Sequence, residues 1–99
     1  MSRLLWSEDA ENDLEAITEY IARDAPAAAL RMRDEIERRL QVLAEHPNIG
    51  RRGRVTGTRE LVLAGTPYIG IYQRQADDVV ILRVLHGARR WPPRDEQRS

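Results

Sequence analysis

The chain has 99 residues, 41% of them hydrophobic, which is the size and composition of one domain with its own core. It contains no cysteine, which excludes disulfides and thiolate metal sites, and no apolar run of signal-peptide or membrane-span length. All 16 basic residues are arginine, and the formal net charge is zero. Residues 1–46 hold 6 Arg and 11 Asp or Glu, a formal −5, whereas residues 47–99 hold 10 Arg and 5 Asp or Glu, a formal +5. We therefore expect a cytoplasmic protein without membrane contact, whose second half suits an anionic partner.

The first half predicts a short strand and two helices. Residues 3–6 are apolar enough for a strand, and Ser7 with the acidic residues behind it predicts a helix N-terminus. Apolar residues at spacings of three and four continue this helix to about Arg23. A second helix begins at Pro26 and runs to about Glu45, so the short break between the two predicts an antiparallel helical hairpin. The apolar faces are Ala10, Leu14, Ile17 and Ile21 in the first helix, and Ala29, Met32, Ile36, Leu40 and Leu43 in the second.

The second half predicts a loop and three strands. Residues 46–54 read as a loop because of their proline and glycine content. Strands are expected at residues 59–63, 68–74 and 79–85, the last two joined by a hairpin turn at residues 75–78.

The element order β-α-α-β-β-β predicts an α+β fold, with the helical hairpin packed on one face of a small, mainly antiparallel sheet. Residues 1–93 are expected to form a single domain, and residues 94–99 a short polar C-terminal tail.

Three arginines in the predicted loop form the densest cationic cluster. Arg51, Arg52 and Arg54 are separated only by Gly53, which leaves room for close approach of a phosphate or an acidic partner. The alternative interpretation is a solubilising loop.

A second basic cluster follows the last predicted strand. Arg89 and Arg90 stand beside Trp91 and three residues after His86, a combination suited to nucleic-acid stacking or to a protein interface. Alternatively, Trp91 simply covers the edge between helices and sheet.

Two arginines lie inside predicted strands. Strand alternation places Arg59 in one row with Leu61 and Leu63, and Arg83 in one row with Val79, Ile81 and Leu85. An arginine in a small sheet needs a carboxylate partner, such as Glu60 or the acidic helices, or an opening onto a groove. Both alternatives stay open from sequence. The two histidines, His46 and His86, have no third ligand at metal-binding spacing, and no cofactor motif occurs, so neither metal nor cofactor is expected.

Short motifs from residue 3 to about residue 93 occur in the order and at the spacing of a known family. They are Trp6-Ser7, Ala10, Asp13-Leu14, Ile17, Tyr20-Ile21, His46-Pro47, Gly50-Arg51, Gly53, Arg59-Glu60-Leu61, Pro67-Tyr68, Tyr72, Val84-Leu85-His86, Arg89 and Trp91-Pro92. Together they resemble the ParE/RelE superfamily of bacterial toxin–antitoxin toxins. The resemblance implies the fold above and one of two activities: RelE-like members are ribosome-dependent endoribonucleases, whereas ParE-like members act on DNA gyrase.

One departure favours the ParE-like branch. In the nuclease branch the penultimate strand carries an arginine three positions before a tyrosine, where it stabilises the phosphate, and here that register places Ile69 before Tyr72. The resemblance therefore favours a gyrase inhibitor without a catalytic site. The alternatives are a RelE-like mRNA endonuclease that uses His86 with Arg83, Arg89 or Arg90, and an inactive antitoxin-binding partner.

The resemblance also implies partners. We expect the target to be bound first by His86, Arg89, Arg90 and Trp91 and second by Arg51, Arg52 and Arg54. A ParD-like antitoxin with a disordered amphipathic C-terminal segment would cover the helical hairpin and reach a groove near Arg59, Tyr68 and Arg83. Operator DNA would be contacted only through the antitoxin.

Overall fold

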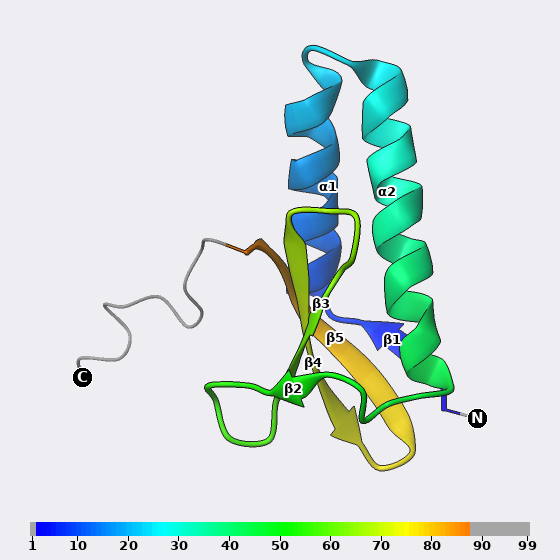
Figure 1. Ribbon diagram of the computed structural model, residues 1–99, viewed down its shortest axis with the longest axis vertical. Coiled ribbons are helices and arrows are strands. Elements are labelled where there is room, and N and C mark those ends of the chain that lie inside the picture. Colours follow the sequence, from blue (N-terminus) through cyan, green and yellow to red (C-terminus); the bar gives the residue numbers. More distant parts are fainter. Residues whose placement is uncertain (1, 88–99) are drawn as a thin grey trace, which may run out of the picture.

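The computed structural model describes residues 2–87 and places a helical hairpin against a five-stranded sheet (Figure 1). The helices lie side by side, and their connecting turn projects beyond the sheet. The predicted α+β fold is confirmed. The elements are β1 (Leu4–Trp6), α1 (Glu8–Ala22), α2 (Pro26–Gln41), a 3₁₀ turn η1 (Val42–Ala44), β2 (Arg51–Arg52), β3 (Arg59–Val62), β4 (Tyr68–Gln75) and β5 (Asp78–His86).

The helix α1 begins where the sequence predicts it. The side chain of Ser7 accepts a hydrogen bond from the N–H of Ala10 at 3.0 Å, so the cap satisfies a donor that the helix leaves unpaired. Ala10 and Leu14 are buried in the core. No helix within residues 2–87 is long and apolar enough to cross a membrane.

The helix α2 ends earlier than the predicted Glu45. It stops at Gln41 and tightens into the 3₁₀ turn η1, where the N–H groups of Glu45 and His46 both donate to the carbonyl of Val42. A residue before proline is disfavoured in the α conformation, so Pro47 opposes continuation of the helix through His46.

The sheet order is β1-β5-β4-β3-β2, with β1 parallel to β5 and all other neighbours antiparallel. The mainly antiparallel sheet that the sequence predicts is confirmed. Both helices cover one face, where they form the core with side chains of β4 and β5 and with Leu63, the residue that follows β3. Its members are Ala10, Leu14, Ile36, Leu40, Leu43, Leu63, Tyr72, Val79, Ile81 and Val84.

The predicted loop at residues 46–54 contains a short strand that its sequence does not predict. Arg51 and Arg52 form β2, the outer strand of the sheet, which pairs with Glu60 and Arg59 of β3. A two-residue strand is too short to show alternation in the sequence. Its two charged side chains are a common way to protect a sheet edge from further pairing.

A bulge in β5 reverses the alternation of its side chains. Ile71 pairs with Arg83 while Tyr72 pairs with Ile81, so Leu82 is an extra residue on β5. One extra residue exchanges the two faces of a strand. The prediction that Arg83 lies in one row with Val79 and Ile81 is therefore wrong.

Candidate functional site

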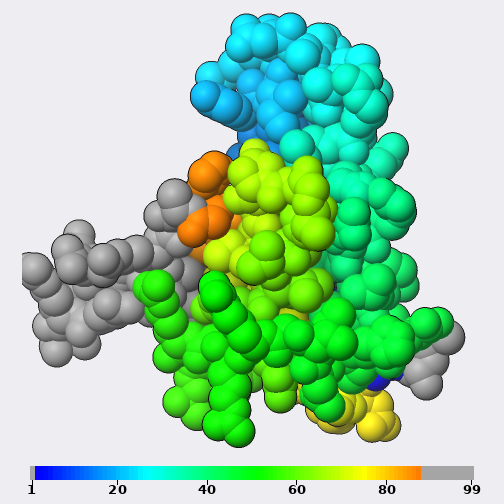
Figure 2. Space-filling model, in the orientation of Figure 1, coloured from blue at the N-terminus to red at the C-terminus, as the bar shows by residue number. Residues whose placement is uncertain are grey.

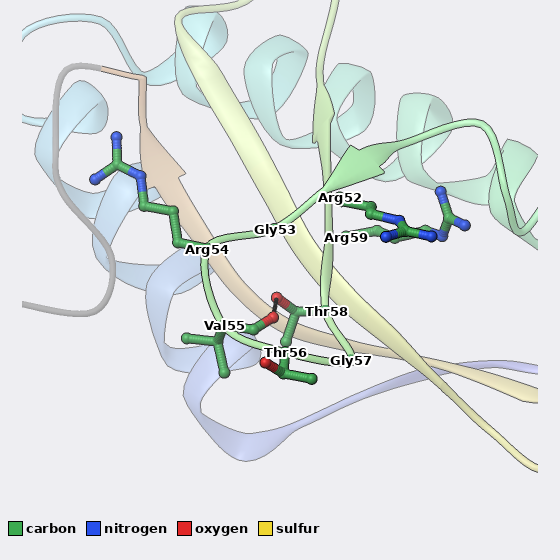
Figure 3. Close-up of a pocket in the computed structure, with 8 residues that line it drawn as sticks. All are labelled: Arg52, Gly53, Arg54, Val55, Thr56, Gly57, Thr58 and Arg59. Atoms are coloured by element: carbon green, nitrogen blue, oxygen red, sulfur yellow. Dashed lines mark hydrogen bonds between the residues drawn. The ribbon is translucent and has the colours of Figure 1, made fainter.

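The hairpin between β2 and β3 carries the cationic cluster and forms a hollow of about 490 Å³ (Figure 3). The N–H of Gly53 donates to the carbonyl of Thr58 at 2.8 Å, and the N–H and hydroxyl of Thr58 both donate to the carbonyl of Val55. Gly57 has a φ of +86°, which a side chain would oppose. The hollow is lined by Arg52, Gly53, Arg54, Val55, Thr56, Gly57, Thr58 and Arg59. In Figure 2 this green segment projects from the lower part of the molecule, away from the turn of the helical hairpin.

Strand pairing divides the arginines of this hairpin between two faces. Arg51 pairs with Glu60 across the strands and forms an ion pair with it at 3.2 Å, while the side chain of Glu60 is 9% exposed. Arg52 pairs with Arg59, so two guanidinium groups extend from adjacent positions. Hence Arg51 is neutralised by Glu60, whereas Arg52 lies beside a second cation, Arg59.

Tyr72 and Arg59 together hold the loop before β2. The hydroxyl of Tyr72 accepts from the N–H of Gly50 at 3.0 Å and donates to the carbonyl of Pro47 at 2.8 Å. Arg59 donates from one nitrogen to the carbonyls of Gly50 and Asn48, at 2.8 and 3.3 Å. Burial raises the pKa of Tyr72, an effect partly opposed by the hydrogen bond from Gly50 and by the charge of Arg59. Arg59 is therefore bound by backbone carbonyls, and not by Glu60.

The sheet face opposite the helices is apolar around the position where the nuclease branch carries arginine. A side chain at Gly70 would meet Leu40 of α2, so its neighbours Ile69 and Ile71 point away from the helices. Ile69 pairs with Leu85, and Ile71 pairs with Glu60, whose charge is matched by Arg51. Isoleucine and leucine cannot stabilise the charge of a scissile phosphate.

Arg83 is held by the helix layer. Its guanidinium donates to both carboxylate oxygens of Asp13 on α1, at 2.7 and 2.9 Å, and the side chains are 25% and 15% exposed. Asp13 also accepts the backbone N–H of Val84 at 2.9 Å. Because β1 pairs only with the first part of β5, Asp13 covers the edge that β1 leaves open.

His86 ends β5 beside an aromatic neighbour. Its ring meets that of Tyr68 edge to face, with centroids 5.8 Å apart and planes at 83°. His86 is exposed, and burial raises the pKa of Tyr68, with a smaller contribution from Tyr20 on α1. Tyr20 itself is 71% exposed.

The structure thus separates several predicted site residues. Arg59 and Arg83 lie on β3 and β5, with β4 between them, and each is held by a different part of the molecule. The predicted target-binding residues Arg89, Arg90 and Trp91 lie outside the described residues. In the described part of the chain, no group of three or more His, Cys, Asp or Glu could hold a metal ion.

Two residues of this arrangement were not predicted as site residues. Asp13 anchors Arg83 and Val84, and Tyr72 anchors the loop at Pro47 and Gly50. Asp13 borders the apolar face of α1 at the position before Leu14, and this placement is a signal that the sequence did contain.

Comparison with known proteins identifies the family. The sequence model of the ParE toxin of the type II toxin–antitoxin system parDE matches residues 4–91. The chain is 46% identical over 90 residues to a candidate toxin, Y4kP, of Sinorhizobium fredii, covering 91% of this chain and 93% of that protein. It is 38% identical over 89 residues to toxin RelE2 of Caulobacter vibrioides, covering 90% of this chain and 99% of that one. A solved structure of the chromosomal ParDE system of P. aeruginosa contains a similar chain, with a TM-score of 0.80 and 27% identity over 87% of this chain and 96% of that one.

This protein is therefore a toxin of the ParE/RelE superfamily, and the resemblance inferred from the sequence is confirmed. Within that class, the chain belongs to the ParE toxin family of type II toxin–antitoxin systems.

Proposed function

We propose that this toxin inhibits DNA gyrase, and hence replication, without a catalytic site of its own. The observation that carries the proposal is the apolar row Ile69, Ile71 and Leu85 on this sheet face. The hollow beside it is also lined by Arg51 and Arg54, and the carboxylate that lines it within residues 2–87, Glu60, is neutralised by Arg51. Cleavage of a phosphodiester needs a cation at the phosphate and an acid–base pair. Binding to a protein target needs neither.

We further propose that a cognate ParD-like antitoxin neutralises the toxin. A similar chain was solved as part of a ParDE system, which supports such a partner. The helical hairpin exposes Tyr20 and Leu30, which are 71% and 62% exposed and suit the apolar face of a partner segment. Such a segment would continue toward Tyr68, and operator DNA would be bound only through the antitoxin.

The gyrase contacts are proposed to lie on the exposed cationic residues. Arg51, Arg52 and Arg54 are exposed on the β2–β3 hairpin, and His86 is exposed at the end of β5. The other proposed contacts, Arg89, Arg90 and Trp91, lie outside the described residues.

A second candidate is a RelE-like ribosome-dependent mRNA endonuclease. It is favoured by the similarity to toxin RelE2 and by the exposed position of His86. In this candidate Arg83 is already held by Asp13, so the cation at the phosphate would come from Arg89 or Arg90.

A supercoiling assay with purified toxin, DNA gyrase, relaxed plasmid and ATP tests the proposal. We expect inhibition with trapped cleaved DNA, relieved by the antitoxin. The parallel arm adds toxin to translating ribosomes and measures mRNA cleavage, with His86→Ala as the control.

Normal supercoiling in the presence of folded, antitoxin-binding toxin contradicts the gyrase proposal. Cut mRNA that disappears with His86→Ala would then establish the endonuclease. If neither activity occurs, the protein is an inactive antitoxin-binding partner.

A further inference from the structure

Two arginines lie directly opposite each other at the outer edge of the sheet. Arg52 of β2 and Arg59 of β3 are register partners, and Figure 3 shows their side chains extending to the same side of the strands. Like charges in directly opposed positions destabilise an antiparallel pair. This arrangement therefore favours any bound anion that can contact both groups.

One member of the pair is already oriented. Arg59 is fixed through a single nitrogen by the carbonyls of Gly50 and Asn48, and Gly50 is itself held by Tyr72. A guanidinium carries five N–H donors, so most of those of Arg59 stay available. Binding an anion here costs less side-chain entropy than binding by two free arginines.

No carboxylate of the described residues neutralises the pair. Glu60 is the neighbour of Arg59 in β3, but alternation directs it to the other face, where it binds Arg51. Arg52 forms no ion pair within residues 2–87 and is exposed. Within residues 2–87, these two adjacent positive charges at an accessible edge thus have no carboxylate as counter-charge.

We propose that Arg52 and Arg59 bind a phosphate group of a nucleic-acid backbone. The two oxygens of a carboxylate lie in one plane and match a single guanidinium fork, whereas the oxygens of a tetrahedral phosphate point in several directions and can accept from two forks at once. The outer strand is open to solvent, so a long polyanion reaches it without entering a closed pocket. The site does not depend on gyrase being the target.

The test measures binding of the purified full-length toxin to a short labelled DNA duplex of mixed sequence by fluorescence anisotropy, from about 50 to 200 mM salt. We expect Arg52→Gln to weaken binding by roughly tenfold at the lower salt and to reduce the slope of log K against log salt by about 0.9, the value of one phosphate contact. Arg52→Lys keeps the charge and should restore the slope. Arg23→Gln, an equal loss of charge at the exposed end of α1, should leave the affinity and the slope near those of the wild type.

Three results overturn the proposal: no binding of DNA by the wild type, no effect of Arg52→Gln, or an equal effect of Arg23→Gln. Competition separates the sources of the anion. Inorganic phosphate should displace the DNA only weakly, because it provides one anion without a backbone. If polyglutamate displaces DNA as well as unlabelled duplex does, and Arg52→Gln abolishes binding of polyglutamate equally, the site recognises carboxylates and the proposal fails. No gyrase is present, so failure here leaves the supercoiling test unaffected.

Discussion

At the scale of single residues, Tyr72 connects the core to the candidate site. Its ring is fully buried beneath the helices, while its hydroxyl binds Gly50 and Pro47 at the sheet edge. A side chain at Gly50 would lie 2.6 Å from this hydroxyl, which explains why the position needs glycine. The buried phenol of Tyr72 thus fixes the position of the loop that leads into Arg51 and Arg52.

Tyr72→Phe should destabilise the fold by about 1–3 kcal/mol, because the N–H of Gly50 and the carbonyl of Pro47 lose their partner. Urea unfolding at neutral pH measures this change. Tyr20→Phe, at a largely exposed phenol, is the control and should stay near the wild type. A Tyr72→Phe variant as stable as the wild type would show that water replaces both hydrogen bonds.

The wild type and Tyr72→Phe together also test how the stability contributed by Tyr72 depends on pH. Since burial raises the pKa of Tyr72 in the folded state, its contribution to stability is full below the ordinary tyrosine pKa of about 10 and is lost as the pH rises through the folded value. We expect the wild type to lose its advantage over Tyr72→Phe in alkaline solution. A constant difference in the free energy of unfolding up to high pH would contradict this.

At the scale of elements, the attachment of α1 to β5 depends on polar side chains as well as on the core. Ser7 accepts from the first turn of α1 and donates from its hydroxyl to the carbonyl of Leu82 at 2.9 Å. Asp13, six residues further along the chain, binds Arg83 and Val84. These contacts lie at the bulge, where regular strand pairing is interrupted.

Asp13→Asn should destabilise the protein by about 1–3 kcal/mol, because Arg83 loses a charge-assisted pair of hydrogen bonds in a half-buried position. Thermal or urea unfolding measures the loss. The matched control is Glu15→Gln, which removes one negative charge from an exposed position of the same helix and should change stability by less than about 0.5 kcal/mol. If both variants behave alike, the effect is one of net charge and not of this contact.

At the scale of the whole molecule, the acidic first half and the basic second half of the sequence lie in different parts of the structure. The carboxylates gather on the helical layer, whereas the β2–β3 hairpin at the outer edge of the sheet carries four arginines. With 16 arginines and no lysine, protonation of the carboxylates leaves a strongly cationic molecule that repels itself.

Acid should therefore unfold the protein cooperatively. The hydrogen bond from Arg3 holds the pKa of Asp78 below its ordinary value, and that from Arg38 does the same for Glu35. Because the pKa values of both carboxyl groups are lowered in the folded state, these groups stabilise the protein at a pH above the ordinary carboxyl pKa of about 4. This stability is lost as the pH falls through the pKa values of the folded state. The denaturant midpoint of Asp78→Asn, measured from pH 7 downward, should fall less steeply than that of the wild type. If the two proteins lose stability equally steeply in acid, Asp78 does not contribute to the pH dependence.

Much of this protein follows from the sequence by itself. The spacing of apolar residues such as Leu14, Ile36 and Leu40 determines which face of each helix enters the core. The order of the elements determines the α+β fold, and the charge counts show that most arginines lie in the second half of the chain. These are local properties, because helix and strand periods depend only on residues a few positions apart.

The partners of the arginines were decided only by the tertiary structure. Register places Arg51 against Glu60 and Arg52 against Arg59, and one bulged residue, Leu82, directs Arg83 out of the row expected for it. Register and bulges are set by packing between strands far apart in the chain, and a shift of one residue exchanges the two faces of a strand. The sequence therefore determines how many charges the sheet edge carries, whereas the pairing of strands decides which are neutralised and which stay available to an anion.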